Sequence, residues 1–245
     1  MAALWVVMPV FNEEGSVRAV IDEWLPVLRA ATSGDFTFCA INDGSRDGTL
    51  GILRAAEREV PELTVVDKPN SGHGQTCAYG YRLAVESGAD WVMQIDSDGQ
   101  CDPRWFAELW AARGEAPAVY GFRRTRDDGY RRQVISRIVS VVTLLGVGVW
   151  VRDANVPYRL MSAASLDPIL PLIPPDFHLT NILVAALQVR YFRVRWIDIG
   201  FRRRTAGVAS VKRYAFAQQA VRLLRQLRAA RRTMGGVPPA TMHGK

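Results

Sequence analysis

The chain has 245 residues, 49% of them hydrophobic, and a formal net charge of +7. This length suits one large α/β domain or a domain with an appendage, and the apolar content is enough for a sizeable core. The three cysteines, Cys39, Cys77 and Cys101, are odd in number and widely spaced, which indicates a reducing compartment and argues against a disulfide framework or a zinc site.

Two further features concern partners and targeting. Residues 190–232 contain thirteen Lys or Arg and one acid, Asp198. Nucleic-acid-binding faces more often mix basic residues with stacking aromatics, so we expect no nucleic-acid partner and favour an anionic membrane or anionic substrate. Residues 1–10 lack the basic start of a signal peptide, so we expect none, and a cytoplasmic location.

The first hundred residues alternate between strand-like and helix-like patterns. Strands are predicted at 4–10, 36–41, 63–66 and 91–95, and helices at about 16–30, from an Asp47 N-cap through Glu59, and from about residue 76 to 87. Such alternation predicts a parallel sheet with helices on both faces, which binds ligands beyond the carboxyl ends of its strands. Asn12, Asp43, Asn70 and Asp96 would all lie at that edge.

Asp96 and Asp98 follow the fourth predicted strand in the sequence QIDSDGQ, residues 94–100. An Asp-x-Asp pair in a turn can direct two carboxylates toward one cation, and Mg²⁺ or Mn²⁺ takes one or two carboxylates together with phosphate oxygens and water. The alternative is an ordinary surface turn, because Asp, Ser and Gly are common turn residues.

The residues of the other turns at this edge also allow two interpretations, a ligand-binding one and a purely structural one. Glu13 could accept hydrogen bonds from a ribose or simply favour a helix N-terminus, and Asp43 could accept from a nucleobase or form an Asx turn. The Gly72–Gly74 loop allows close approach of a phosphate, and within it His73 is expected to be a loop residue rather than a catalytic base. No dinucleotide fingerprint or phosphate-loop lysine motif follows the first strand, which argues against a dehydrogenase or a kinase-like NTPase.

Four ordered segments together resemble glycosyltransferase family 2: residues 8–14 (MPVFNEE), 41–49 (INDGSRDGT), 70–74 (NSGHG) and 96–100 (DSDGQ). The resemblance covers about residues 4–213, and within the family it is greatest to dolichol-phosphate mannose synthases and bacterial polyprenyl-phosphate glycosyltransferases. It implies a GT-A fold, which is an α/β, Rossmann-like, mostly parallel sheet with helices on both faces. It also implies a nucleotide-sugar half at 1–101 and an acceptor half at 102–213.

The resemblance extends into the acceptor half. Arg123 follows a strand, and the helix that begins near Gly129 resembles a family segment in which Arg and Ser contact the acceptor phosphate, here Arg132 and Ser136, four residues apart on one face. A solvated basic helix start is the alternative. The helix continues through the uncharged run 138–151, which at about fourteen residues is too short for a bilayer span. Its apolar face could meet lipid tails or the acceptor's isoprene chain, or pack on its own protein.

Two further carboxylates, Asp153 and Asp176, are candidates for a general base. Asp153 opens a segment that resembles the family's Asp-x-x-x-Gly-Phe-Arg, with Pro157 and Tyr158 in place of Gly-Phe. Asp176 stands where family members that act on a hydroxyl often place an Asp base, although the preceding Glu of their Glu-Asp pair is missing. A polyprenyl phosphate is already ionised near neutral pH and needs no base, so this departure favours a phosphate acceptor.

The C-terminal part begins with a predicted strand at 194–200. Residues 202–212 then resemble the Arg-x-x-Gly-x-Ser-Lys loop that closes over the diphosphate, with one extra residue before Ser210 and Val211 separating Ser from Lys. Arg204 and Lys212 would contact the diphosphate; an electrostatic surface loop is the alternative. An amphipathic basic helix is predicted at 214–232, suited to a membrane interface or to packing on its own domain, and a disordered tail at 233–245.

These observations lead to one hypothesis and two alternatives. The hypothesis is an inverting, metal-dependent hexosyltransferase, peripheral on the cytoplasmic face of a membrane, that uses a GDP-mannose- or UDP-glucose-class donor and a polyprenyl or dolichyl phosphate acceptor; a membrane-anchoring partner protein is compatible with it. The alternatives are a family 2 enzyme acting on a hydroxyl, with Asp176 or Asp153 as base, and a non-catalytic nucleotide-sugar-binding protein.

The resemblance also implies which residues form the site. Those implied to bind the nucleotide sugar are Pro9, Phe11, Glu13, Asp43, Asp96, Arg123, Arg204 and Lys212. Those implied to hold Mg²⁺ or Mn²⁺ are Asp96, Asp98 and Gln100, and those implied to act in catalysis are Asp96, Asp98, Arg132, Ser136 and Arg204.

Overall fold

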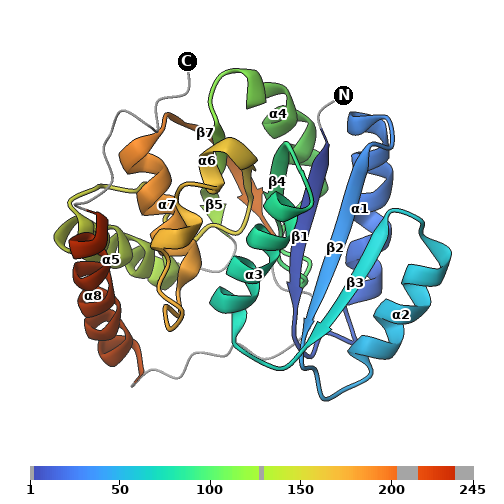
Figure 1. Cartoon of the computed structure of the whole chain (residues 1–245), viewed down its shortest axis with the longest axis horizontal. Coiled ribbons are helices and arrows are strands. Elements are labelled where there is room, and N and C mark those ends of the chain that lie inside the picture. Colours follow the sequence, from blue (N-terminus) through green and yellow to red (C-terminus); the bar gives the residue numbers. More distant parts are fainter. Residues whose placement is uncertain (1–2, 127–129, 203–214, 235–245) are drawn as a thin grey trace.

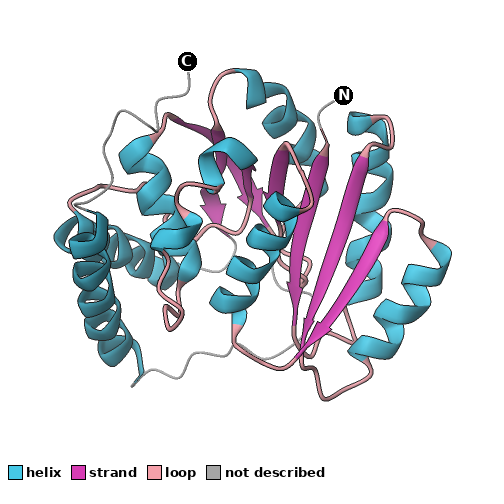
Figure 2. Ribbon diagram, in the orientation of Figure 1, coloured by secondary structure: helices cyan, strands magenta, loops and turns pink. Residues whose placement is uncertain are grey.

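The computed structural model describes residues 3–126, 130–202 and 215–234, with side chains for 3–123, 135–202 and 220–232. Within these residues, seven strands form one sheet in the order β3-β2-β1-β4-β6-β5-β7, with helices on both faces (Figures 1 and 2). The strands are β1 (Leu4–Val10), β2 (Phe36–Asp43), β3 (Leu63–Lys68), β4 (Trp91–Gln94), β5 (Ala118–Arg126), β6 (Arg159–Ser162) and β7 (Val194–Phe201). The main helices are α1 (Val17–Thr32), α2 (Thr49–Glu59), α3 (His73–Glu86), α4 (Phe106–Ala111), α5 (Tyr130–Val147), α6 (Ala163–Leu166), α7 (Thr180–Tyr191) and α8 (Ala215–Met234), with short 3₁₀ turns at Pro103–Trp105, Ala112–Gly114 and Leu170–Leu172.

The sheet is mostly parallel, as predicted. β1 pairs in parallel with both β2 and β4, β2 pairs in parallel with β3, and β5 pairs in parallel with β7. Among the seven described strands, β6 alone runs antiparallel to its neighbours, β4 and β5, and the sequence patterns did not predict this strand. Since β1, β2, β3 and β4 point the same way, the turns that follow them meet at one edge of the sheet.

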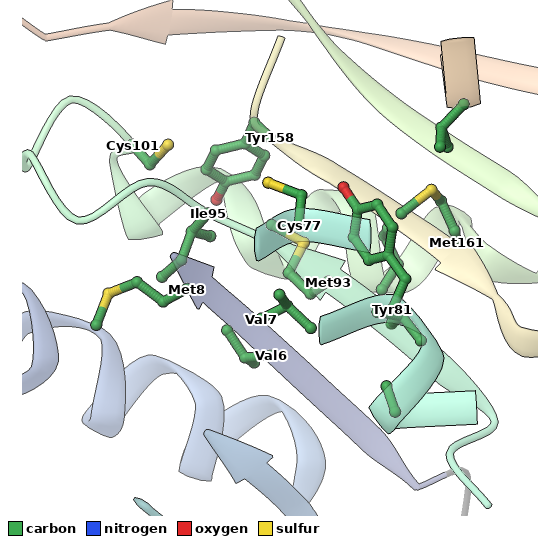
Figure 3. Packing of buried hydrophobic residues seen from close by; sticks show 14 of the residues in the cluster. Val6, Val7, Met8, Cys77, Tyr81, Met93, Ile95, Cys101, Tyr158 and Met161 are labelled. Carbon is green, nitrogen blue, oxygen red and sulfur yellow. The ribbon is translucent and has the colours of Figure 1, made fainter. Parts of the chain in front are cut away.

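β1 is buried in the core, with α3 packed on it and α1 on the opposite face of the sheet. Val6, Val7 and Met8 are fully buried, and Cys77 and Tyr81 of α3 lie over this strand (Figure 3). α3 approaches closely because it carries Gly80 there: a Cβ at that position would lie 2.4 Å from Cγ1 of Val7. All three cysteine thiols are buried and none forms a disulfide.

The start of α2 differs from the prediction. Gly48, not Asp47, occupies the N-cap position. Asp47 still stabilises this helix start, because its Oδ1 accepts a hydrogen bond from the backbone N–H of Thr49 at 3.1 Å. Its other oxygen accepts from the N–H of Glu14 at 3.3 Å, so the carboxylate joins the two turns that follow β1 and β2.

α5 and α8 lie side by side at the end of the molecule away from α1 and α2 (Figure 1). α5 ends at Val147, four residues earlier than the predicted run, because Gly148 adopts a left-handed φ of 76°. α8 buries Leu223, Leu227 and Ala230. Of the two alternatives for this helix, the structure therefore shows the second, in which its apolar face packs on its own domain.

Residues 235–245, most of the predicted tail, lie outside the described residues. In the part of the chain that the structure describes, no helix has the length and hydropathy of a bilayer span.

Candidate donor site at the carboxyl edge of the sheet

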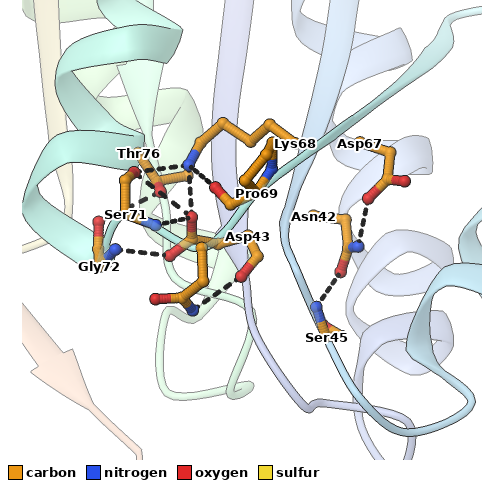
Figure 4. Close-up of polar contacts among 10 residues, drawn as sticks. Asn42, Asp43, Ser45, Asp67, Lys68, Pro69, Ser71, Gly72 and Thr76 are labelled. Atoms are coloured by element: carbon orange, nitrogen blue, oxygen red, sulfur yellow. Dashed lines mark hydrogen bonds and ion pairs between the residues drawn. The ribbon is translucent and has the colours of Figure 1, made fainter.

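Asp43 ends β2 and organises the neighbouring turn. Its carboxylate pairs with Lys68 of β3 and accepts hydrogen bonds from the backbone N–H groups of Ser71 at 2.8 Å and Gly72 at 2.9 Å (Figure 4). Burial raises the pKa of Asp43, but Lys68 and the Ser71 N–H lower it more, so it lies below its ordinary value of 3.8. Asp43 is thus ionised and ties β2 to β3 and to the start of α3.

Glu13 joins the turn after β1 to the Asp-x-Asp turn through Ser16. The hydroxyl of Ser16 lies 2.7 Å from Oε2 of Glu13 and 3.1 Å from the carbonyl oxygen of Ser97. The Glu13 N–H also donates to the Thr49 hydroxyl at 2.8 Å. Glu13 is buried, so this carboxylate lies beneath the surface of the site rather than at it.

Asp96, directly after β4 and Ile95, faces the first residue of α3. Its Oδ1 lies 3.1 Å from Nε2 of His73 and 3.3 Å from Nε2 of Gln94. Oε1 of Gln94 in turn accepts a hydrogen bond from the hydroxyl of Tyr81 at 2.7 Å. The same hydroxyl lies 3.0 Å from Oδ1 of Asn181 in α7. A buried polar network therefore orients this carboxylate from behind.

The charges around Asp96 keep it ionised. Burial raises its pKa, but the neighbouring His73 and the guanidinium groups of Arg123 and Arg159 lower it more, so the pKa of Asp96 lies below its ordinary value. An ionised, partly exposed carboxylate is the form that a divalent cation requires.

Asp98 and Gln100 sit in a turn that is fastened to the end of β7. The N–H of Gln100 donates to Oδ1 of Asp98 at 3.1 Å, and the Gln100 side-chain amide donates to the carbonyl oxygen of Arg202 at 2.9 Å. The N–H of Arg202 donates back to the Gln100 carbonyl oxygen at 3.2 Å. Gln100 therefore anchors the Asp-x-Asp turn to the residue that precedes segment 203–214.

The two aspartates fit a divalent cation when the remaining ligands come from the substrate. Among the described residues, no group of three or more His, Cys, Asp or Glu side chains could hold a metal ion without further ligands. Mg²⁺ and Mn²⁺ commonly take one or two carboxylates and complete their shell with phosphate oxygens and water. The hard oxygen donors of Asp96 and Asp98 suit this arrangement.

Other predicted residues have structural partners or lie outside the description. Arg123 forms a bidentate pair with Asp153, with N–O distances of 2.7 and 2.6 Å, so the guanidinium and the carboxylate are already paired with each other. Asp176 is exposed and lies in the loop before α7. Pro9 is buried in β1, Phe11 is exposed beyond it, and Ser136 lies half-buried in α5. Arg204, Lys212 and the side chain of Arg132 lie outside the described residues, so their roles stay predictions.

Three contributors to this edge were not predicted from the sequence. His73 is the first residue of α3 rather than a loop residue, and it contacts Asp96. Ser16 and Tyr81 connect elements far apart in the chain. The glycines on both sides of His73 are the one sequence signal for it, since they mark a helix start near the carboxyl edge of the sheet.

The chain matches the family model described as "Glycosyl transferase family 2" over residues 5–176. It is 28% identical over 215 residues to an undecaprenyl-phosphate 4-deoxy-4-formamido-L-arabinose transferase of Pseudomonas fluorescens, covering 80% of this chain and 62% of that protein. It is 28% identical over 166 residues to the transferase of the same name from Aeromonas hydrophila, covering 67% of this chain and 50% of that protein. The chain thus spans half to about three-fifths of the length of these relatives.

Solved structures show the same fold. Glucosyl-3-phosphoglycerate synthase from Mycobacterium tuberculosis, in complex with Mn²⁺, UDP-glucose and phosphoglyceric acid, superposes with a TM-score of 0.62 at 20% identity, covering 97% of this chain and 81% of that one. S. aureus TarS, in complex with UDP, superposes with a TM-score of 0.58 at 16% identity, covering 92% and 65%. At these identities the likeness concerns the fold.

Proposed function

Since this chain belongs to glycosyltransferase family 2, we propose that it transfers a hexosyl group, with inversion, from a nucleotide-diphosphate sugar to a polyprenyl phosphate at a membrane surface. The donor is of the GDP-mannose or UDP-glucose class. Two observations support the proposal: the relatives named as undecaprenyl-phosphate sugar transferases, and the outward-facing apolar side chains of α5 described below. The second observation carries the lipid half of the proposal.

The donor half rests on the ionised edge around β1, β2 and β4. Asp96 and Asp98 would hold Mg²⁺ or Mn²⁺ on the diphosphate, and the bound ion would neutralise charge that develops on the leaving group. His73 and Gln94 fix the orientation of Asp96. Pro9 and Asp43, near the ends of β1 and β2, and Phe11 and Glu13, in the turn after β1, would lie near the nucleoside. Arg204 and Lys212 would approach the diphosphate from the segment after Arg202.

In its described part, α5 exposes several apolar side chains and buries the hydroxyl groups of Ser140 and Thr143, the reverse of a helix on a water-facing surface. Leu145 is 56% exposed and Val141 44% exposed, and Ile135, Ile138 and Leu144 are exposed with them. By contrast, Ser140 and Thr143 are buried and donate to the carbonyl oxygens of Val151 at 2.7 Å and Val139 at 2.8 Å. An exposed apolar patch of this kind calls for an apolar partner.

The charges around this face favour an anionic lipid surface. Arg137 and Arg152 are exposed at either end of the apolar run, and α8 beside it exposes Arg222, Arg225 and Arg228. Residues 130–152 and 215–234 contain no acidic residue. Apolar insertion combined with basic residues is the pattern of interfacial helices. Arg132 and Ser136, on the first two turns of α5, would then meet the acceptor phosphate at the lipid surface.

A phosphate acceptor also agrees with the carboxylates of this chain. Asp153 is paired with Arg123, and Asp176 lacks the preceding Glu. A polyprenyl phosphate oxygen is ionised near neutral pH, so it can attack the anomeric carbon without a base while the bond to the nucleotide diphosphate breaks. Transfer to a hydroxyl would instead need one of these carboxylates to take a proton.

The experiment is a transfer assay with Mn²⁺ and radiolabelled GDP-mannose or UDP-glucose. The acceptor is supplied in vesicles, either as polyprenyl phosphate or as the corresponding polyprenol. We expect label in the organic phase from one donor and only with the phosphate. Transfer to the polyprenol would favour the hydroxyl alternative, and donor binding without transfer to either lipid would favour a non-catalytic protein.

A further inference from the structure

The loop between η3 (Leu170–Leu172) and α7 lies between α8 and the start of α3. Two hydrogen bonds come from one side chain of α8: Oε1 of Gln226 lies 2.8 Å from Nδ1 of His178, and Nε2 of Gln226 donates to the carbonyl oxygen of Asp176 at 3.0 Å. Gln226 therefore holds residues 176–178 at two points.

The partners define the orientation of both groups. A backbone carbonyl only accepts, so the Gln226 atom facing Asp176 must be the NH₂ group, which leaves Oε1 facing His178. Because Oε1 also only accepts, Nδ1 of His178 must carry the hydrogen. Burial is the largest cause that lowers the pKa of His178, so the neutral ring is favoured, with its hydrogen on Nδ1.

The same loop packs tightly on the first turn of α3. The side-chain amide of Gln75 donates to the carbonyl oxygen of Phe177 at 2.8 Å. A Cβ at Gly74 would lie 2.3 Å from the carbonyl oxygen of His178 and 3.0 Å from the N atom of Thr180. At these distances any side chain at position 74 would collide with backbone, so the loop and the first turn of α3 lie in direct contact.

The start of α3 in turn touches two carboxylates of the proposed donor site, those of Asp43 and Asp96. The N–H of Gly72 donates to Oδ2 of Asp43 at 2.9 Å, and His73 contacts Oδ1 of Asp96 at 3.1 Å. A continuous set of contacts thus runs from Gln226 through His178 and Gly74 to Asp43 and Asp96.

We propose that Gln226 and His178 are positioning residues that couple α8 to the donor site, so that α8 fixes the start of α3 relative to Asp43 and Asp96. This makes α8 part of the framework for nucleotide binding as well as a neighbour of the apolar face of α5. The inference rests on the proposed donor site.

The test measures the Kd of a nucleoside diphosphate (GDP and UDP, each with Mn²⁺) by calorimetry, without lipid. Gln226→Met keeps the length of the side chain and removes both hydrogen bonds, and His178→Ala removes one. We expect each to weaken binding by about tenfold, equivalent to about 1.4 kcal/mol. The double variant should be no weaker than either single variant, since both remove the same coupling. His178→Asn, whose amide can donate from the Nδ1 position, should bind close to the wild-type value.

Ala229→Met is the matched control, because Ala229 is exposed on α8 one turn after Gln226. If Gln226→Met and His178→Ala bind as tightly as the control with the same melting temperature, the coupling is refuted. Should Gln226→Met lose helix content, the comparison of His178→Ala with His178→Asn decides the question. A wild-type protein that binds neither nucleotide would refute the donor site itself, which is a separate result from unaffected variants.

Discussion

Nε2 of His73 lies 3.1 Å from Oδ1 of Asp96, so the first residue of α3 touches the first carboxylate after β4. Gln94 approaches the same oxygen at 3.3 Å. Two donors from different elements therefore orient the carboxylate that is proposed to hold the divalent ion, and outer contacts of this kind tune metal affinity.

His73→Ala is expected to weaken the apparent affinity for Mn²⁺ in the transfer assay by roughly 10- to 100-fold, because the variant leaves Asp96 less well oriented. The measurement is initial rate against Mn²⁺ concentration at saturating donor. His73→Gln, which can place an amide donor near the Nε2 position, should recover part of the loss. An unchanged Mn²⁺ dependence in His73→Ala would show that this contact does not support the metal.

Asp43→Asn is expected to lower the free energy of unfolding at pH 7 by about 3 kcal/mol, because it leaves Lys68 without its buried partner. The folded-state pKa of Asp43 is lowered, so its contribution is fully present above the ordinary value and is lost as pH falls through the folded pKa. Urea unfolding at pH 7 and at pH values below 3.8 should therefore show the difference between wild type and variant shrinking in acid.

Asp22→Asn is the control for that comparison, since Asp22 pairs with Arg18 on an exposed face of α1. Such pairs contribute about 0–1 kcal/mol, so this variant should change stability little at either pH. A stability difference for Asp43→Asn that persists undiminished in acid would contradict the ionised pair.

Asp176→Asn separates the two acceptor classes. A general base contributes about 10²- to 10⁴-fold to rate, whereas an ionised phosphate acceptor needs none. We expect the variant to keep turnover with polyprenyl phosphate near the wild-type value, measured as initial rate at saturating acceptor. A loss of 10² or more with unchanged donor binding would assign Asp176 as the base and favour a hydroxyl acceptor.

Replacing the outward apolar residues of α5 should abolish membrane contact without unfolding the protein. Val141→Glu with Leu145→Glu adds two charges at positions that are already exposed, so stability should change little. Cosedimentation with anionic vesicles should fall to background. Tyr79→Glu, at an exposed aromatic residue of α3, is the control. Equal vesicle binding by the double variant and the control would place the lipid surface elsewhere.

Much of the first half of the fold could be predicted because its signals are local. β1, α1, β2, α2, β3, α3 and β4 follow from apolar runs and the turns between them, and parallel pairing then brings Asp43 and Asp96 to one edge. The contacts that remained unpredicted join distant residues. Arg123 and Asp153 are 30 positions apart, and His178 and Gln226 are 48 apart. No local pattern specifies such a pair, since each partner is also a common surface residue.

The second half also contains reversals that periodicity does not reveal. β6 runs antiparallel between β4 and β5 and places Arg159 in the core, where its guanidinium donates to the carbonyl oxygens of Val156 at 3.0 Å and Asn181 at 2.8 Å. The pattern of α8 allowed either membrane contact or packing on the domain, and burial of Leu227 against Gly146 of α5 decides it. Tertiary packing, rather than local propensity, determines these features.

The central claim is that Asp96 and Asp98 hold a divalent ion on a nucleotide diphosphate, and an electron paramagnetic resonance titration of Mn²⁺ measures it directly. The wild-type protein should bind one Mn²⁺ tightly when GDP or UDP is present, and Asp98→Asn, which keeps an oxygen for the Gln100 N–H, should lose that binding with its fold unchanged. If Asp98→Asn binds Mn²⁺ and nucleotide as the wild type does, the two carboxylates do not form the site.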